Sequence, residues 1–284
     1  MNPYMARNRH LIVHESGNRR PLIWVQPGLQ QAEVIEKLGP DQPVYCVARP
    51  TLDRTKPPLS FDEITSYHME TIRSLCPEGP YALTANYGHA AIAFEIASRL
   101  LREGEPISVL ILINPADPAI SRTPVVREPG LFRLRLAFDR ILFHLQKVKD
   151  QGAKDQLTYW RQKIKATKDR QKNNAHASST AGQTAGAPPL PKFRNVAHAD
   201  AYAFSSHVLR RSMGEAILIR PAKAPRHAYD YPNLRWTALF ARGLDIQQVP
   251  GDSGTMWYGN NACVLAQKLQ RLCDVRSAKT QLTG

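Results

Sequence analysis

Short apolar runs alternate with helix-like patterns in the first and last parts of the chain. Four runs in the first part are rich in β-branched and aromatic residues, and residues with helical spacing separate them. Such runs are typical of strands that are buried on both faces of a parallel sheet. The predicted strands cover residues 21–26, 43–48, 81–85 and 107–113.

Two amphipathic helices are predicted between these strands. The first begins with a capping box, in which the side chains of Ser60 and Glu63 bond each other's backbone amides. Phe61 starts its apolar face. The second helix is predicted over residues 88–102, where apolar side chains recur among small residues, and Gly104 follows as its terminator.

The pattern changes after residue 117 and returns to alternation near residue 212. Residues 131–172 have a strongly basic helical pattern, and about nine net positive charges fall between residues 122 and 172. Residues 173–191 are too poor in large apolar side chains to fold by themselves, which predicts a mobile loop. Alternation then resumes with predicted helices at 198–210, 236–240 and 262–273 and predicted strands at 216–220 and 245–249.

This order of elements predicts an α/β fold with a mostly parallel, doubly wound sheet and a helical lid insertion. The predicted core comprises residues 1–117 and 212–284. Residues 118–211 form the predicted basic lid, with the flexible segment at 173–191.

Composition adds an electrostatic expectation and removes several classes of site. The chain has 284 residues with 43% hydrophobic and 22% charged, which is ordinary for a soluble globular protein, whereas a net charge of +14 favours an acidic partner. No apolar run approaches the roughly 20 residues of a membrane span and no secretory leader is visible, so a cytoplasmic protein is expected. The four cysteines lack zinc-ligand or disulfide-framework spacing. No metal or cofactor is predicted.

Several colinear segments carry a family resemblance. They read PLIWVQPG, GPDQPVYCVARPTLD, PEGPYALTANYGHAAIAFEIASRL, VLILINPADP and VPGDSGTM. In this order they closely resemble the thioesterase domains of non-ribosomal peptide and polyketide synthetases, a branch of the alpha/beta-hydrolase fold. That family has HPGGG after its first strand, a GxSxG elbow before AFEMA, and PGDHxxM near its end. The match runs from about Leu11 to Leu272.

The resemblance implies a Ser-Asp-His triad whose three positions are all changed. The serine falls on Tyr87, the aspartate on Asn114 and the histidine on Ser253. A serine attacks a thioester only when a histidine takes its proton and a carboxylate orients that histidine. A phenol has an intrinsic pKa of about 10, and a serine cannot act as a base near neutrality. The sequence therefore predicts a degenerate triad.

The resemblance also implies an oxyanion hole and an elbow turn. The oxyanion donors would be the backbone amides of Leu29 and Gly88, which do not depend on side chains. His89 occupies the later glycine position of the elbow, where a ring replaces a small residue, and Ala85 keeps the earlier small position. We therefore expect a relaxed or altered turn.

Other polar residues near these positions have two interpretations each. Tyr87 could act as a nucleophile, but a pocket-filling or hydrogen-bonding tyrosine is favoured. His89 could supply a base, but a packed or capping histidine is favoured. Carboxylates could replace the missing acid, but turn capping or a solvated loop is favoured at each one. These acidic and neighbouring residues are Asp117, Asp252, His227 and Asp230.

The preferred functional prediction is a thioesterase-like protein that has lost its hydrolytic triad. It would bind a carrier-tethered acyl or peptidyl group, or its carrier protein, because family lids cover a pocket that receives a chain on a phosphopantetheine arm. Carrier docking surfaces are typically acidic, and basic lid residues could complement them; solvated helix faces are the alternative. The lid candidates are Arg133, Arg135, Arg140, Lys147, Arg161, Lys163 and Lys165.

Two rival functions stay open at this point. One is an active hydrolase, acyltransferase or cyclase with a repurposed Tyr87/His89 site. The other is a binder of an anionic surface through the basic lid; nucleic acid is disfavoured because the sequence has no helix-turn-helix, RRM or zinc-finger signature. A histidine entering the site from the lid, such as His198 or His207, also stays open.

Overall fold

The computed structural model describes one compact part of the chain. The described residues are 10–50, 59–118, 203–204, 207–212, 214–223 and 235–282, with side chains through Asp274 except that of Arg235. All of them belong to a single unit of the structure. Most of the predicted lid, including its basic candidates and the segment 173–191, lies outside the described residues.

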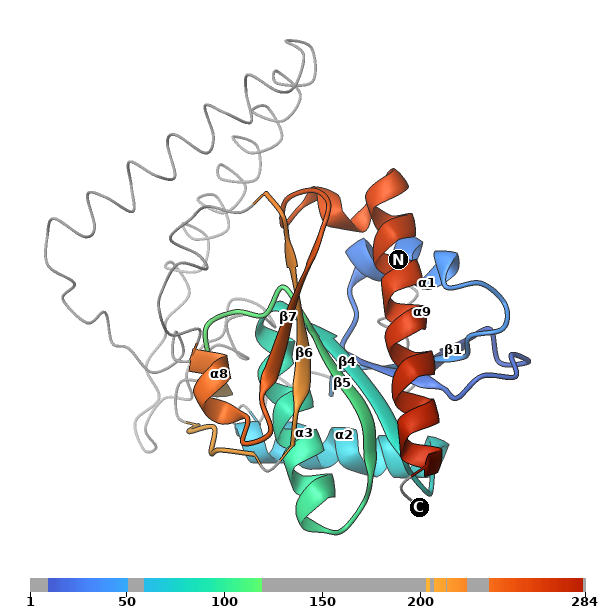
Figure 1. The fold of residues 1–284 in the computed structure, drawn as a ribbon. Helices are drawn as coiled ribbons and strands as arrows, with labels where there is room; N and C mark the ends of the chain where they lie inside the picture. The colour runs from blue at the N-terminus through green and yellow to red at the C-terminus, as the bar shows by residue number, and fades with distance from the viewer. Residues whose placement is uncertain are drawn as a thin grey trace, which may run out of the picture. The chain divides into compact units, whose positions relative to one another are not determined.

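A seven-stranded sheet forms the centre of this unit (Figure 1), with strand order β1-β3-β2-β4-β5-β6-β7. Every neighbouring pair is parallel except β1 with β3. This confirms the predicted mostly parallel, doubly wound sheet. The strands are β1 (His10–Val13), β2 (Leu22–Val25), β3 (Val44–Val47), β4 (Tyr81–Asn86), β5 (Ile107–Ile113), β6 (Ala216–Pro221) and β7 (Leu244–Val249).

Helices cover both faces of the sheet (Figure 1). Alternate strand residues point to opposite faces, so Ile23 and Val25 of β2 pack in one apolar cluster and Leu22 and Trp24 pack in the other. The first cluster includes α2 and α3, and the second includes α1 and α9. The described helices are α1 (Ala32–Lys37), α2 (Phe61–Leu75), α3 (Ala90–Arg102), α8 (Arg235–Leu239) and α9 (Gly259–Leu282).

The predicted helix signals are confirmed in part. The Ser60 hydroxyl accepts from the Glu63 amide at 3.2 Å, and the Ser60 amide donates to the Glu63 carboxylate at 2.7 Å, so the capping box is present. Gly104 has φ 83° just beyond α3, as a terminator requires. The predicted start of the second helix is wrong, because residues 87–89 form a 3-10 turn and α3 begins at Ala90.

Within the described residues, three short 3-10 helices lie near the points where strands end and helices begin. They are η2 (Leu29–Gln31), η3 (Tyr87–His89) and η4 (Thr255–Trp257). None of the helices in the described part of the chain is both long and apolar enough to cross a membrane. The same described residues hold no group of three or more side chains that could ligate a metal.

Candidate functional site

Three adjacent strand ends carry residues in a strained backbone conformation. Gln26 follows β2 with φ 51°, Tyr87 follows β4 with φ 50°, and Asn114 follows β5 with φ 45°. Residues other than glycine rarely adopt this left-handed conformation, and those that do concentrate at functional sites. The carboxyl ends of parallel strands are also where α/β sheets bind ligands. The candidate site is therefore this edge of the sheet.

The turn at Tyr87 is strained, so of the predicted relaxed or altered turn the relaxed alternative is wrong. Tyr87 has positive φ in spite of its large side chain, and its carbonyl accepts from the Ala116 amide at 3.1 Å. Ala85 and Ala90 are fully buried, which lets α3 approach β4 closely. His89 is only half-buried at the end of the 3-10 turn, so its ring does not displace the helix.

The Tyr87 hydroxyl joins the elbow to the loop after β7. It donates to the Ser253 carbonyl oxygen at 2.6 Å and accepts from Trp257 Nε1 at 2.7 Å. Trp257 Nε1 also lies 3.0 Å from the same carbonyl oxygen. The two aromatic rings are tilted, with centroids 5.9 Å apart. The phenol is therefore held as a hydrogen-bonding group between two segments 166 residues apart in the sequence.

The surroundings of Tyr87 disfavour its ionisation. Burial raises the pKa of the phenol, whereas hydrogen bonding from Trp257 and Asn114 lowers it and the nearby Tyr258 and Asp252 raise it; the net direction is upward. A nucleophilic phenolate would need the opposite, a base or cation that lowers the pKa. At neutral pH this tyrosine is therefore protonated.

The structure brings together Tyr87, Asn114 and Ser253, the three positions that the family resemblance predicts for a triad, but their contacts do not form a proton relay. Asn114 is buried just after β5. Its backbone amide donates to the Ile219 carbonyl at 2.6 Å, and its side chain interacts with the Tyr87 phenol. Ser253 meets the phenol through its backbone carbonyl, while the residue itself is exposed. The position predicted for the histidine thus contributes a carbonyl acceptor to the Tyr87 phenol.

Asp252 is a turn cap, as the favoured interpretation predicted. One carboxylate oxygen accepts from the Gly254 amide at 2.8 Å and from the Thr255 amide at 2.9 Å, which fixes the start of η4. Asp117 is exposed after β5. The other loop candidates, His227 and Asp230, lie outside the described residues.

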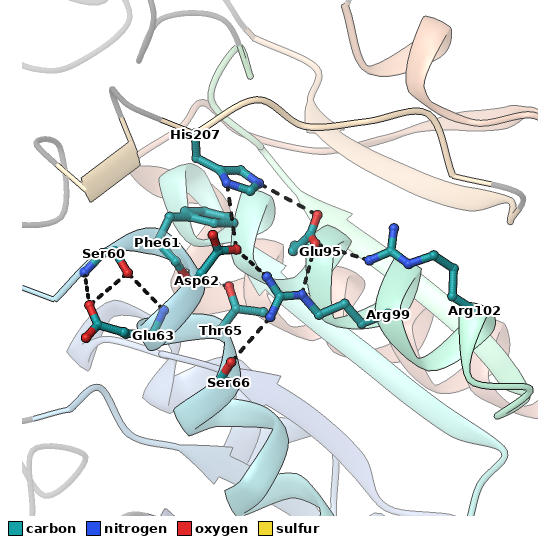
Figure 2. A network of polar contacts seen from close by, with 10 residues as sticks. All are labelled: Ser60, Phe61, Asp62, Glu63, Thr65, Ser66, Glu95, Arg99, Arg102 and His207. Atoms are coloured by element: carbon teal, nitrogen blue, oxygen red, sulfur yellow. Dashed lines mark hydrogen bonds and ion pairs between the residues drawn. The ribbon is translucent and has the colours of Figure 1, made fainter.

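Histidines near the site occupy other positions than a base would. His89 is the N-cap residue of α3 but makes no side-chain capping bond. His207 stacks on Phe61 with ring centroids 4.0 Å apart and faces Asp62 and Glu95, so its described contacts are with α2 and α3 (Figure 2). His198 lies outside the described residues.

The sequence interpretation missed a buried polar pair behind the site. His68 of α2 is fully buried, and its Nε2 lies 2.7 Å from Gln26 Nε2 at the end of β2. Burial, His89 and Arg49 lower the pKa of His68 to about 3, so the ring is neutral. Its place on the apolar face of α2, seven residues after Phe61, was the available signal.

The loop after β2 contains Leu29, one of the two residues predicted to supply oxyanion-hole amides. The Gly28 amide donates to the Gln31 side-chain oxygen at 2.7 Å, which folds the loop into η2. Leu29 then begins η2 with an exposed side chain, and Gly88 lies in η3 at the end of the adjacent strand β4. The two predicted donor residues therefore follow neighbouring strands.

Comparisons with known proteins give matches in sequence and in fold. A family model described as Thioesterase domain matches residues 32–271. Malpibaldin synthetase of Mortierella alpina is 38% identical over 111 residues, and the non-reducing polyketide synthase ntnG of Nectria sp is 34% identical over 120 residues. These matches cover 37% and 41% of this chain, but only 2% and 6% of the two relatives. The chain thus spans a small fraction of the relatives' length.

Solved structures share the fold across nearly the whole chain. The thioesterase domain NocB superposes with a TM-score of 0.56 at 16% identity, covering 93% of this chain and 98% of that domain. A four-domain nonribosomal peptide synthetase bound to AMP and glycine gives a TM-score of 0.58 at 16% identity, covering 90% of this chain and 20% of that one. The fold is therefore that of the alpha/beta hydrolases.

Proposed function

Because the chain belongs to the thioesterase domain family of non-ribosomal peptide and polyketide synthetases, we propose that it binds a carrier-tethered acyl or peptidyl group and does not cleave it by the serine mechanism. The observation that carries this proposal is the Tyr87 hydroxyl, which takes the nucleophile's place and is held by the Ser253 carbonyl and Trp257. A site without the serine nucleophile and the histidine base loses the acyl-enzyme route, while the groups that bind the substrate do not depend on that triad.

The chemistry of the three positions supports this proposal. Proton transfer from the phenol requires an acceptor that can carry a proton, and a backbone carbonyl cannot serve as that base near neutral pH. Asn114 is uncharged, so it cannot stabilise an imidazolium. The raised pKa of Tyr87 adds to the barrier, because less phenolate forms at neutral pH.

The backbone of the site supports binding of a thioester carbonyl. The amides of Leu29 and Gly88 are the proposed donors to the carbonyl oxygen, since oxyanion holes are built from backbone amides at such strand ends. Leu29 is 58% exposed and its neighbour Gln30 lies 3.5 Å from the Tyr87 hydroxyl, so an apolar side chain borders the site. This rim would contact the pantetheine arm or the acyl chain.

We propose a carrier protein, free or within a synthetase, as the macromolecular partner. The net charge of +14 complements an acidic docking surface, and the proposed lid, residues 118–211, contains much of the positive charge. The lid would approach the carrier while the edge with Tyr87 receives the tethered group. Anionic vesicles and nucleic acid serve as comparison ligands for the rival that binds any anionic surface.

The test is a titration with carrier proteins that are unloaded or loaded with an acyl group. We expect the loaded carrier to bind at least about tenfold more tightly, and Leu29→Asp to remove most of that difference because it places a charge at the apolar rim. Ile246→Asp is the matched control, since Ile246 is exposed on β7 away from the site. Equal affinities for loaded and unloaded carriers, or equal binding to vesicles, would contradict the proposal.

A further inference from the structure

An aromatic side chain lies directly beside the elbow. Phe204 is 9% exposed, and a Cβ placed on Gly88 would lie 3.7 Å from its Cε2 atom. Its ring packs edge-on against Phe61 of α2, with centroids 5.3 Å apart. Phe204 therefore fills space next to the backbone amide that is the proposed oxyanion donor.

His207 fastens the same segment to two helices (Figure 2). Its ring stacks on Phe61, with planes 17° apart, so Phe61 contacts both Phe204 and His207. Its Nδ1 lies 4.0 Å from the Asp62 carboxylate on α2, and its Nε2 lies 3.8 Å from the Glu95 carboxylate on α3. Both separations exceed a hydrogen bond, so stacking on Phe61 is the main contact that holds the ring.

The carboxylates that face His207 already have cationic partners. Arg99 donates to Glu95 at 3.0 Å and also pairs with Asp62, and Arg102 lies 3.4 Å from Glu95 (Figure 2). Arg99 also donates to the Ser66 hydroxyl at 3.3 Å. Two arginines thus balance two carboxylates. The cluster is electrically neutral when His207 is neutral.

The His207 ring is held mainly in its neutral form when it is docked, that is, stacked on Phe61 between α2 and α3. Burial lowers the pKa of His207 and Arg99 lowers it further, whereas Glu95 and Asp62 oppose them; the net direction is downward. A histidine with a lowered pKa in the docked state stabilises docking above its ordinary pKa. That stability is lost as the pH falls from about 6.5 through the lowered value. Acid should therefore loosen the contact of His207 with α2 and α3.

We infer that Phe204 determines which acyl groups fit beside Gly88 and that His207 is the positioning residue that holds Phe204 there. The shared contact with Phe61 transmits the position of one side chain to the other. The part that concerns acyl groups rests on the proposed function. Under this inference, mild acidification displaces the Phe204 ring and leaves the hydrogen bonds of Tyr87 unchanged.

A ligand-free experiment tests the positioning role. The amide signal of Gly88 is followed by NMR between about pH 8 and about pH 5, together with the ring signals of His207. We expect the Gly88 signal to contain a component that follows the His207 titration, because a moving Phe204 ring changes its local field. That component should vanish in His207→Gln and in Phe204→Leu, and persist in His10→Gln on the distant strand β1. A Gly88 titration that is unchanged in His207→Gln would overturn the positioning role.

A ligand experiment tests the specificity role. The dissociation constants of acetyl-pantetheine and phenylacetyl-pantetheine are compared in the wild type, Phe204→Leu and Phe204→Ala. We expect the smaller side chains to favour the larger acyl group by about tenfold relative to acetyl, which is the usual effect of pocket volume. An unchanged ratio in variants with native circular dichroism would overturn it. If no protein binds either thioester, the proposed function fails together with the specificity role, while the NMR result still decides the positioning role.

Discussion

At the residue scale, Tyr87 makes hydrogen bonds that join two distant segments of the fold. Its hydroxyl accepts from Trp257 and donates to the Ser253 carbonyl, so it connects η3 to the loop before η4. A phenol can make this connection because it reaches further from the elbow than a serine. The residue at the predicted nucleophile position therefore stabilises the edge of the sheet where the candidate site lies.

Replacing Tyr87 with phenylalanine should lower the free energy of unfolding by about 1 kcal/mol, the usual net value of a hydrogen bond. The loss is small because the Trp257 indole keeps the Ser253 carbonyl as a partner at 3.0 Å. Urea unfolding measures it. Tyr258→Phe is the control, because Tyr258 is 51% exposed and should show no change. Equal stability of Tyr87→Phe and the wild type would count against the structural role.

The neutral His68 predicts a specific loss of stability in acid. Its pKa is lowered from 6.5 to about 3, so below 6.5 protons bind the unfolded chain before the folded one. Acid therefore favours unfolding through this residue. The stability advantage of the wild type over His68→Gln should shrink between about pH 7 and about pH 4. Urea unfolding at both pH values measures this advantage. An advantage that stays constant or grows as the pH falls would refute the assignment of His68 as a neutral ring in the folded state.

At the element scale, most strands could be predicted from their apolar runs, whereas the half-buried strand β1 and the short helix α1 could not. The apolar runs of β2, β4 and β5 had no other interpretation, because every residue of β2 and β4 is buried. The edge strand β1 is only half-buried, and α1 has six residues, too few for a periodic pattern to emerge. The helix predicted at residues 262–273 also stops short of the end of α9 at Leu282, because the apolar spacing does not continue there.

The loop after β7 depends on one glycine. Gly251 has φ 91°, and a Cβ there would lie 2.8 Å from Asn261 Nδ2 and 2.9 Å from Thr255 Oγ1. Gly251→Ala should therefore lower the melting temperature more than Gly39→Ala, because Gly39 has a similar φ of 77° but open space around it. The difference isolates crowding from backbone strain, which costs about 1 kcal/mol or more by itself. Equal losses in both variants would mean that crowding at Gly251 is relieved without cost.

At the scale of the whole molecule, the sequence predicted which residues meet at the candidate site but not the contacts between them. Colinear motifs identified Tyr87, Asn114 and Ser253, because the motifs follow strands whose order the fold determines. Strain at the elbow and the bond from Trp257 to Tyr87 depend on segments 170 residues apart, which periodicity cannot relate. The position of Phe204 beside Gly88 could not be predicted for the same reason.

The net charge of the whole chain predicts how the rate of association with the proposed carrier depends on salt. A net charge of +14 should accelerate association with an acidic carrier at low salt. We expect the association rate constant to fall about tenfold or more between about 0.05 M and about 0.5 M salt, while dissociation changes little. Stopped-flow kinetics with a carrier whose acidic residues are neutralised provides the control. A rate that is independent of salt would exclude electrostatic steering.

The most direct test of the central claim is to incubate the protein with a panel of acyl-phosphopantetheinyl carrier proteins and follow intact mass and product release. An active thioesterase domain serves as the positive control. We predict intact thioesters, no acyl adduct on the protein, and identical results for wild type and Tyr87→Phe. Release or an adduct that disappears in Tyr87→Phe would show a rebuilt active site, with Tyr87 as its nucleophile or acid, and would contradict the account.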